Sequence, residues 1–148
     1  MREMKFQAYW KEKGIMLGVS SIDFSTYVSD GKSSGLSRFY TLDDYEDESN
    51  YIPKGTNFNL YLDEVEMRQY TGLKDRNGKE IYVGDIVRVL IQGGYSQHFI
   101  DQEVVTSVMY IPSKAHYKPF DQCRIWMEDG KLPKVEVIGN IYENPELL

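Results

Sequence analysis

Apolar and polar residues alternate in short stretches along the whole chain. Phe58, Leu60 and Leu62 alternate with Asn59 and Tyr61, which is the period of two that a half-buried strand shows. Aromatic and β-branched residues dominate these stretches, as they do in strands, and no helical pattern runs beyond about ten residues. The pattern predicts strands over Lys5–Trp10, Ile15–Ile22, Leu36–Leu42, Phe58–Leu62, Val65–Tyr70, Ile86–Ile91, Glu103–Ile111, Arg124–Glu128 and Lys134–Ile138.

Turn-forming residues separate the predicted strands. Lys11–Gly14 is typical of a hairpin turn, and Asn77-Gly78 suits a tight turn because both residues tolerate positive φ. Gly84-Asp85 indicates another turn before Ile86–Ile91, a run that is apolar on both faces except at Arg88 and therefore typical of a central strand. Short strands with such frequent turns predict a mainly β fold, either a small barrel or a sandwich.

Four segments do not fit the strand pattern. Residues 43–48 hold five acids in six positions, so mutual repulsion predicts a solvated, poorly ordered loop or at most a short helical turn. The Gly-containing segment Gln92–Gln97 is predicted to be a mobile loop, and Ser113–Asp121 is predicted to be irregular. The tail Tyr142–Leu148 is expected to form a short helical turn or a docking segment.

Composition narrows the classes of function. The 148 residues include 41% apolar and 14% aromatic residues, enough for a folded core in one domain or two very small ones. The net charge of −6 is shared evenly between the two halves, which argues against a general nucleic-acid binder. The sequence has no apolar run of membrane-spanning length and no signal-peptide pattern at its start, so we expect a cytoplasmic protein without membrane contact. The single cysteine, Cys123, allows no intramolecular disulfide and fits a reducing compartment.

The sequence around the predicted turns resembles a known family. Residues 70–75 (YTGLKD), 77–82 (NGKEIY) and 84–87 (GDIV) resemble the signature of the YopX family of phage and prophage proteins. The opening residues 5–10 (KFQAYW) with 21–24 (SIDF), and the close from Val135 to Leu148, are also similar to that family. The signature residues, which we expect to be structural, are Tyr70, Gly72, Leu73, Asp75, Asn77, Gly78, Ile81, Tyr82, Gly84 and Asp85.

The resemblance implies a fold and an origin but no catalytic residues. It implies a β-rich protein with a small SH3-like β-barrel, encoded by a phage or prophage in a bacterial host. We place that barrel at residues 63–148 and additional N-terminal strands at residues 1–62, with little helix and with the two regions packed as one compact unit.

Candidate chemical motifs are weak. Gly31-Lys32-Ser33 resembles the end of a phosphate-binding loop, but Thr26 stands where that motif needs a glycine. His98, His116 and Cys123 are too widely spaced for a typical zinc site, and the acids at 43–48 lack the calcium-loop glycine. Cys123 lies in a strand-like run and is expected to be a small buried hydrophobe. We therefore expect no catalytic residue, no cofactor and no metal.

Aromatic residues around the irregular segments are the best candidates for a binding site. Tyrosine is enriched at interfaces, although the same rings could instead cover the ends of the barrel as core. The leading hypothesis is a non-enzymatic accessory protein that binds a host or phage protein through these rings and through acidic patches. The candidate surface comprises Tyr95, Tyr110, His116, Tyr117 and Phe120.

Two alternative functions remain open at this point, and self-association is considered beside them. A small β-barrel could bind single-stranded nucleic acid by stacking bases on aromatic rings, with cations that Lys114, Lys118 and Arg124 would supply. An enzyme whose residues form no familiar motif is a second alternative. Self-association through strand edges or through the tail is compatible with either reading, so a homo-oligomer is also considered.

Overall fold

The computed structural model describes residues 4–23, 36–91, 102–120 and 127–148. Most of these residues lie in antiparallel strands, and the helical segments among them are two single turns of 3₁₀ helix, so the predicted mainly β class is confirmed. Two compact units are present: an N-terminal unit, Lys5–Gln69, and a C-terminal unit, Tyr70–Leu148 with Met4. Their boundary falls inside strand β7 (Val65–Lys74). The sequence-based division into residues 1–62 and residues 63–148 stays a prediction.

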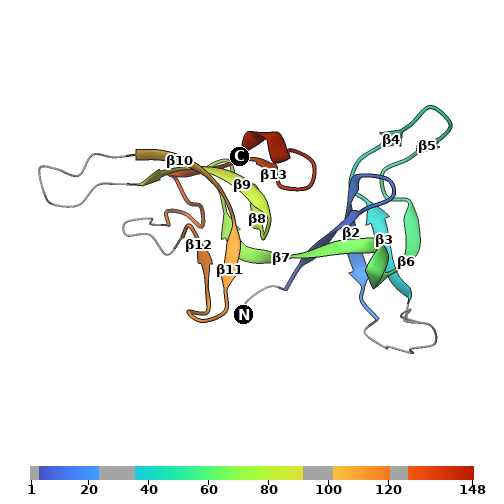
Figure 1. Cartoon of the computed structure of the whole chain (residues 1–148), viewed down its shortest axis with the longest axis horizontal. Helices are drawn as coiled ribbons and strands as arrows, with labels where there is room; N and C mark the ends of the chain where they lie inside the picture. Colours follow the sequence, from blue (N-terminus) through green and yellow to red (C-terminus); the bar gives the residue numbers. More distant parts are fainter. Residues whose placement is uncertain (1–3, 24–35, 92–101, 121–126) are drawn as a thin grey trace, which may run out of the picture. The chain divides into compact units, whose positions relative to one another are not determined.

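The N-terminal unit is a curled antiparallel sheet with the strand order β6-β3-β2-β1-β7 (Figure 1). β1, β2, β3 and β6 match the predicted strands to within a residue or two, whereas β7 continues past its predicted end at Tyr70 to Lys74. The turn after the first strand forms as expected, because Gly14 adopts a φ of 69° and its N–H donates to the Trp10 carbonyl at 2.8 Å. A 3₁₀ turn, which the sequence pattern did not predict, leads into β7. The bounds are β1 Phe6–Trp10, β2 Ile15–Ser21, β3 Leu36–Thr41, β6 Asn57–Tyr61 and η1 Leu62–Glu64.

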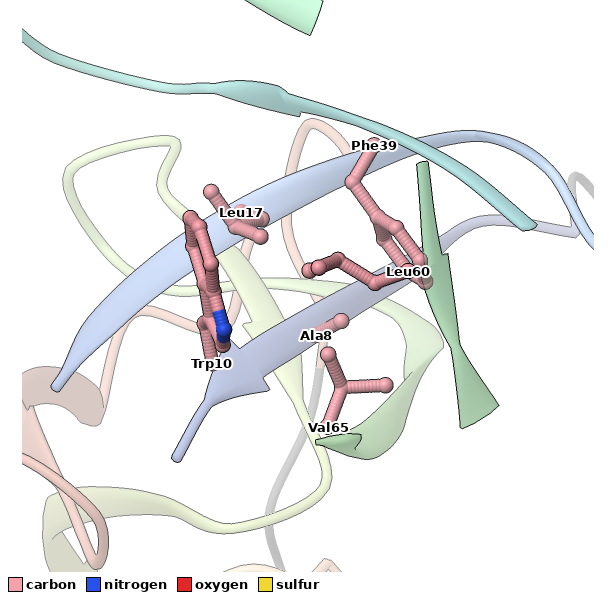
Figure 2. Packing of buried hydrophobic residues seen from close by; sticks show 6 residues of the cluster. All are labelled: Ala8, Trp10, Leu17, Phe39, Leu60 and Val65. Atoms are coloured by element: carbon pink, nitrogen blue, oxygen red, sulfur yellow. The ribbon is translucent and has the colours of Figure 1, made fainter. Parts of the chain in front are cut away.

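Alternation along these strands sends one set of side chains into a shared core. Figure 2 shows six of them converging from neighbouring strands, and all six are buried. The rings of Trp10 and Phe58 pack in a tilted arrangement with their centroids 4.9 Å apart. Burying a large side chain of this kind contributes roughly 2–3 kcal/mol, so this cluster is the main source of stability in the unit. The cluster comprises Ala8, Trp10, Leu17, Phe39, Leu60 and Val65.

The acidic segment is ordered, contrary to expectation. It forms a hairpin of two short strands, β4 (Tyr45–Glu46) and β5 (Tyr51–Ile52), at one end of the N-terminal sheet (Figure 1). Asp47 Oδ1 accepts hydrogen bonds from the backbone N–H groups of Ser49 and Asn50, both at 2.8 Å. These two donors hold the pKa of the Asp47 carboxyl below its ordinary value. Local side-chain to backbone bonds thus overcome the repulsion that the acid run suggested.

The C-terminal unit contains a three-stranded antiparallel sheet with the order β10-β9-β13. β9 is its central strand, as its apolar sequence predicted. β8 pairs with the second half of β7, and β11 pairs with β12 as a separate hairpin. Within the described ranges the strands form no closed barrel, so the expected SH3-like barrel is not confirmed. The bounds are β8 Glu80–Tyr82, β9 Asp85–Ile91, β10 Gln102–Ser107, β11 Met109–Ile111, β12 His116–Lys118, β13 Val135–Asn140 and η2 Pro145–Leu147.

Strands β8, β9 and β13 and two connecting segments supply the buried residues of the second core. Its buried members are Ile81, Val87, Val89, Val108, Leu132 and Val135. β9 lies in the middle of the three-stranded sheet and contributes two of these residues, so it is the central strand of both the sheet and the core. Leu73, Tyr117, Phe120 and Val137 pack against the same cluster while remaining partly exposed.

Two sequence predictions for this unit were wrong in detail. The strand expected over Glu103–Ile111 is interrupted at Val108, which is buried and exchanges backbone hydrogen bonds with Gly84 and Asp85. The segment expected to be irregular, Ser113–Asp121, contains β12, because a turn at Ile111–Ala115 brings His116–Lys118 back beside β11. In the first case hydrogen bonds to residues distant in sequence decide the local structure, and in the second case the pairing of two adjacent strands in a hairpin decides it. The alternation of apolar residues reveals neither.

Several predictions concern residues outside the described ranges: the loop Gln92–Gln97, most of the strand Arg124–Glu128, Cys123, His98 and Gly31-Lys32-Ser33. The last predicted strand is confirmed as β13, and the tail forms the expected short helical turn, η2. Among the helices that the described residues form, none is long and apolar enough to cross a membrane.

Candidate interaction surface

The turn after β7 is built around the buried side chain of Asp75. Its Oδ1 accepts hydrogen bonds from the N–H groups of Asn77 and Lys79, both at 2.9 Å, and closes the turn. Its Oδ2 accepts the N–H of Val137 in β13, also at 2.9 Å. Gly78 completes the turn at a φ of 81°, a region that favours glycine. One carboxylate therefore closes a local turn and joins it to a distant strand.

A bulge in β7 lies just before this turn. The register between β7 and β8 shifts between the pairs Tyr70–Tyr82 and Lys74–Glu80, and Gly72 lies in the gap with a φ of 85°. The rings of Tyr70 and Tyr82 contact each other across the strands with centroids 5.5 Å apart. A glycine at positive φ is one standard way to build such a bulge.

The second turn of the signature connects β8 to β9. Asp85 Oδ2 accepts the N–H of Tyr82 at 2.8 Å, and Gly84 adopts a φ of 87°. Gly84 also donates its N–H to the Val108 carbonyl and accepts the N–H of Ile141, both at 2.9 Å. This turn thus holds together the start of β9, the end of β10 and the chain after β13.

The C-terminal segment closes on itself through Asn140. Its Oδ1 accepts the N–H groups of Tyr142 and Glu143, at 3.0 and 2.9 Å, and its own N–H donates to Asn144 Oδ1 at 3.2 Å. A Cβ placed on Gly139 would lie 2.7 Å from Asn144 Oδ1, so a glycine is needed where the chain passes this close. These contacts account for the glycine and asparagine residues in the closing part of the family-like sequence.

The aromatic candidates that the structure describes gather on the β11–β12 hairpin. Tyr110 and Tyr117 are directly opposite each other in the ladder, and their ring centroids lie 5.2 Å apart at an interplanar angle of 56°. Tyr110 is 46% exposed and its neighbour Met109 is 52% exposed, whereas Tyr117 is half-buried and packs on the second core. We define the hairpin surface as Met109, Tyr110, His116 and Tyr117.

The other members of the predicted surface differ in their burial. His116 begins β12 and is half-buried, while Phe120 follows the hairpin and packs against the second core. Tyr95 lies outside the described residues. Tyr117 and Phe120 therefore pack against the core, whereas Tyr110 faces solvent, and the role of Tyr110 in binding stays a prediction. Lys114 and Lys118 are exposed near them, and Arg124 is not described.

The described residues hold no group of three or more histidine, cysteine, aspartate or glutamate side chains that could bind a metal ion. His98 and Cys123, two of the three groups considered for metal binding or nucleophilic catalysis, lie outside those residues. In the acidic segment, the side chains of Asp44 and Asp47 accept hydrogen bonds from backbone N–H groups.

Sequence reasoning missed a cluster of charged side chains on β9, β10 and β13. Arg88 forms ion pairs with Glu103 and with Glu136, both at 3.3 Å, and Arg76 joins Glu136 at 2.9 Å. The only signal in the sequence was Arg88, the one polar side chain in an otherwise apolar strand. Its partners come from strands that the ladder places on either side of β9, so only the topology identifies them.

The fold and these contacts define a small, mainly β protein whose turns are fixed by buried aspartate and asparagine side chains. Residues 5–148 match the family described as YopX protein, and the chain therefore belongs to the YopX family. Among solved structures it is similar to one described as the crystal structure of protein EF1440 from Enterococcus faecalis. The identity is 26% and the TM-score 0.55, over 100% of this chain and 99% of that chain. None of the curated proteins matches the chain.

Proposed function

We propose that the protein is a non-enzymatic interaction module that binds another protein, of the host or of a phage, through the hairpin surface. One observation carries this proposal: the exposed ring of Tyr110 is held against Tyr117, which is itself anchored on the core. An exposed ring with such support loses little side-chain entropy when a partner covers it. Interface hot spots are enriched in tyrosine for this reason, and the adjacent Met109 extends the apolar contact.

The proposal includes an origin and a place of action. The family resemblance supports a phage or prophage accessory protein that acts in the cytoplasm of a bacterial host. We also propose that the C-terminal unit is a small SH3-like barrel, in which segment 74–76 lies beside β13. The isolated parallel bridge between Asp75 and Leu132, and the hydrogen bond from Arg76 N–H to the Val135 carbonyl, support that arrangement.

The experiment compares three tagged proteins in affinity capture from a bacterial lysate, with and without nuclease. The wild type and Tyr51→Ser, which changes a tyrosine that is 61% exposed on β5, are expected to capture the same protein in similar amounts. Tyr110→Ser is expected to bind that protein at least about tenfold more weakly, since removing a hot-spot ring costs more than about 1.4 kcal/mol. Equal capture by both variants would overturn the role of the hairpin surface.

A second candidate function is single-strand nucleic-acid binding at the same hairpin. Lys114 and Lys118 are both exposed close in sequence to Tyr110 and Tyr117, so cations and a stacking ring occur together. This candidate predicts that captured material disappears on nuclease treatment. It also predicts that affinity for a mixed-sequence single strand falls steeply as salt is raised, and a salt-independent affinity would contradict it.

A further inference from the structure

The charged cluster surrounds a hollow on one face of the β10-β9-β13 sheet. The hollow has a volume of about 190 Å³. Arg76, Arg88 and Lys134 supply positive charge around it, while Glu103 and Glu136 supply negative charge. Leu90 and Pro133 add apolar surface to its lining, whereas Val135, which also borders the hollow, has its side chain buried in the second core. Charged and aliphatic groups therefore meet in one concave place.

The ladder explains why the charges converge. Arg88 lies in the central strand, directly opposite Glu136 in β13 and opposite Val105 in β10. Glu103 is two residues from Val105 and so lies on the same face, diagonally across from Arg88. Arg76 reaches Glu136 from the turn that Asp75 fixes beside β13.

The two carboxylates are held very differently. Glu136 has a side chain that is 25% exposed, and its Oε2 is shared by the guanidinium groups of Arg76 and Arg88. Glu103 is 64% exposed and has one ion pair, from its Oε1 to Arg88 Nε at 3.3 Å. Exposed pairs of this kind contribute only about 0–1 kcal/mol. Glu103 can therefore leave Arg88 at little cost, whereas Glu136 remains as a fixed member of the cluster.

Charge balance favours an anion at the position that Glu103 occupies. The guanidinium groups of Arg76 and Arg88 balance the carboxylates of Glu103 and Glu136, although the whole chain carries −6. Without Glu103 at Arg88, the two guanidinium groups exceed the carboxylate of Glu136 by one charge, and the edge of Arg88 that Glu103 leaves suits a carboxylate bidentately. The apolar lining matches the aliphatic stem of a glutamate side chain better than it matches a compact inorganic anion.

We propose that this hollow is a second binding site, which takes a glutamate side chain from an acidic peptide segment of a partner protein. The ligand carboxylate displaces Glu103 from Arg88, and its methylene groups contact Leu90 and Pro133. Glu103 then acts as an internal competitor that keeps the site closed to weakly bound anions. This site shares no residue with the hairpin surface, so it stands or falls independently of the proposed function.

The test is a titration of the full chain with short blocked peptides, followed through backbone amide NMR signals. The probes are acetyl-Gly-Ala-Glu-Ala-Gly-amide, the same peptide with glutamine in place of glutamate, and the glutamine peptide with a free carboxyl terminus. We expect the glutamate peptide to shift the amides of Arg88, Glu103 and Val135. The glutamine peptide is expected to shift none of them. A response to the free terminus that equals or exceeds the glutamate response would overturn the assignment to a side chain.

Two substitutions separate binding from a purely structural ion-pair network. Arg88→Gln is expected to lower affinity for the glutamate peptide at least tenfold, and Glu103→Gln is expected to raise it three- to tenfold by removing the competitor. Arg38→Gln, which changes an exposed arginine on β3, is the matched control and should leave affinity unchanged. If Arg88→Gln perturbs folding, Arg76→Gln provides the same test, with a smaller expected loss of affinity for the glutamate peptide.

The direction of the Glu103→Gln effect decides the outcome. A structural network gives no reason for tighter peptide binding when one of its acids is neutralised. Unchanged or weaker binding by Glu103→Gln would overturn the proposal, as would an equal loss in Arg38→Gln. Tyr110→Ser should bind the peptide like the wild type, so a failure of the hairpin proposal and a failure of this one remain distinguishable.

Discussion

The carboxylate of Asp75 accepts a hydrogen bond from the backbone amide of Val137 at 2.9 Å, across 62 residues of chain. Strand β13 pairs with β9 on one side, and on the other side its Val135 carbonyl accepts the N–H of Arg76. Asp75 thus supplies, from a side chain, the acceptor that a neighbouring strand would supply from its backbone. It protects the edge of β13 and fixes the turn beside it in a single arrangement.

Replacing this carboxylate by an amide is expected to be costly. In Asp75→Asn one oxygen remains for the turn, and the NH₂ group faces another donor at Val137. A buried N–H left without an acceptor costs about 1–3 kcal/mol, so we expect a loss of about 2–3 kcal/mol in the free energy of unfolding. Urea denaturation measures this loss of stability, and hydrogen exchange of the Val137 amide reports the loss of its acceptor. The exposed Asp63→Asn should stay within about 0.5 kcal/mol, and equal losses in the two variants would contradict this account.

The turn glycine Gly84 is expected to tolerate alanine worse than a glycine in open space. Its φ is 87°, and a Cβ there would lie 3.2 Å from Tyr142 Cε2 and 3.5 Å from Ile141 Cδ1. Gly130 has a φ of 76° but no atom within 4 Å of its Cβ position, so Gly130→Ala measures backbone strain alone, about 1–2 kcal/mol. Gly84→Ala should cost about 1 kcal/mol more in thermal or urea unfolding, and equal costs would show that the Tyr142 contact adjusts freely.

Tyr40 covers Gly18 on the outer face of the N-terminal sheet. The two residues are opposite each other in the ladder between β2 and β3, and a Cβ on Gly18 would overlap the tyrosine ring. The ring current should therefore shift the Gly18 Hα protons upfield, and Tyr40→Leu should return them to ordinary positions. Gly18→Ala should displace the ring and destabilise the sheet by about 1 kcal/mol. Ordinary Gly18 shifts in the wild type would argue against this packing.

The order of the acidic hairpin should depend on pH through Asp47. Backbone N–H groups of Ser49 and Asn50 lower the pKa of its carboxyl below 3.8, its ordinary value. For a lowered pKa, the stabilising effect is complete above the pKa of the unfolded chain and is lost as pH falls through the folded-state pKa. The amide signals of Ser49 and Asn50 should therefore titrate with a midpoint below 3.8. Asp47→Asn should abolish that step, and a midpoint at or above 3.8 would contradict the assignment.

Local chemistry along the chain was sufficient to predict most of the strands. The period of two over Phe58–Leu62 places Phe58 and Leu60 on one face of β6, where both contact the first core. Asn77-Gly78 and Gly84-Asp85 specify turns because their φ preferences are intrinsic to those residues. Family membership also followed from these strings, since the turn residues of the signature are contiguous in sequence.

Tertiary structure decided which residues meet. The sequence around Asp75 does not predict its hydrogen bond with Val137, and the sequence around Arg88 does not predict its ion pairs with Glu103 and Glu136. Strand order and register bring these residues together. Non-local hydrogen bonds to Gly84 and Asp85 likewise interrupt the strand expected over 103–111 at Val108, whereas the strand His116–Lys118 arises from a local hairpin with β11. Hydrophobic periodicity reports which face of a segment is buried, but hydrogen bonds between strands far apart in sequence depend on the whole topology. For that reason the sequence determined the strands and turns of this protein, while the fold determined its charged hollow and its exposed tyrosine.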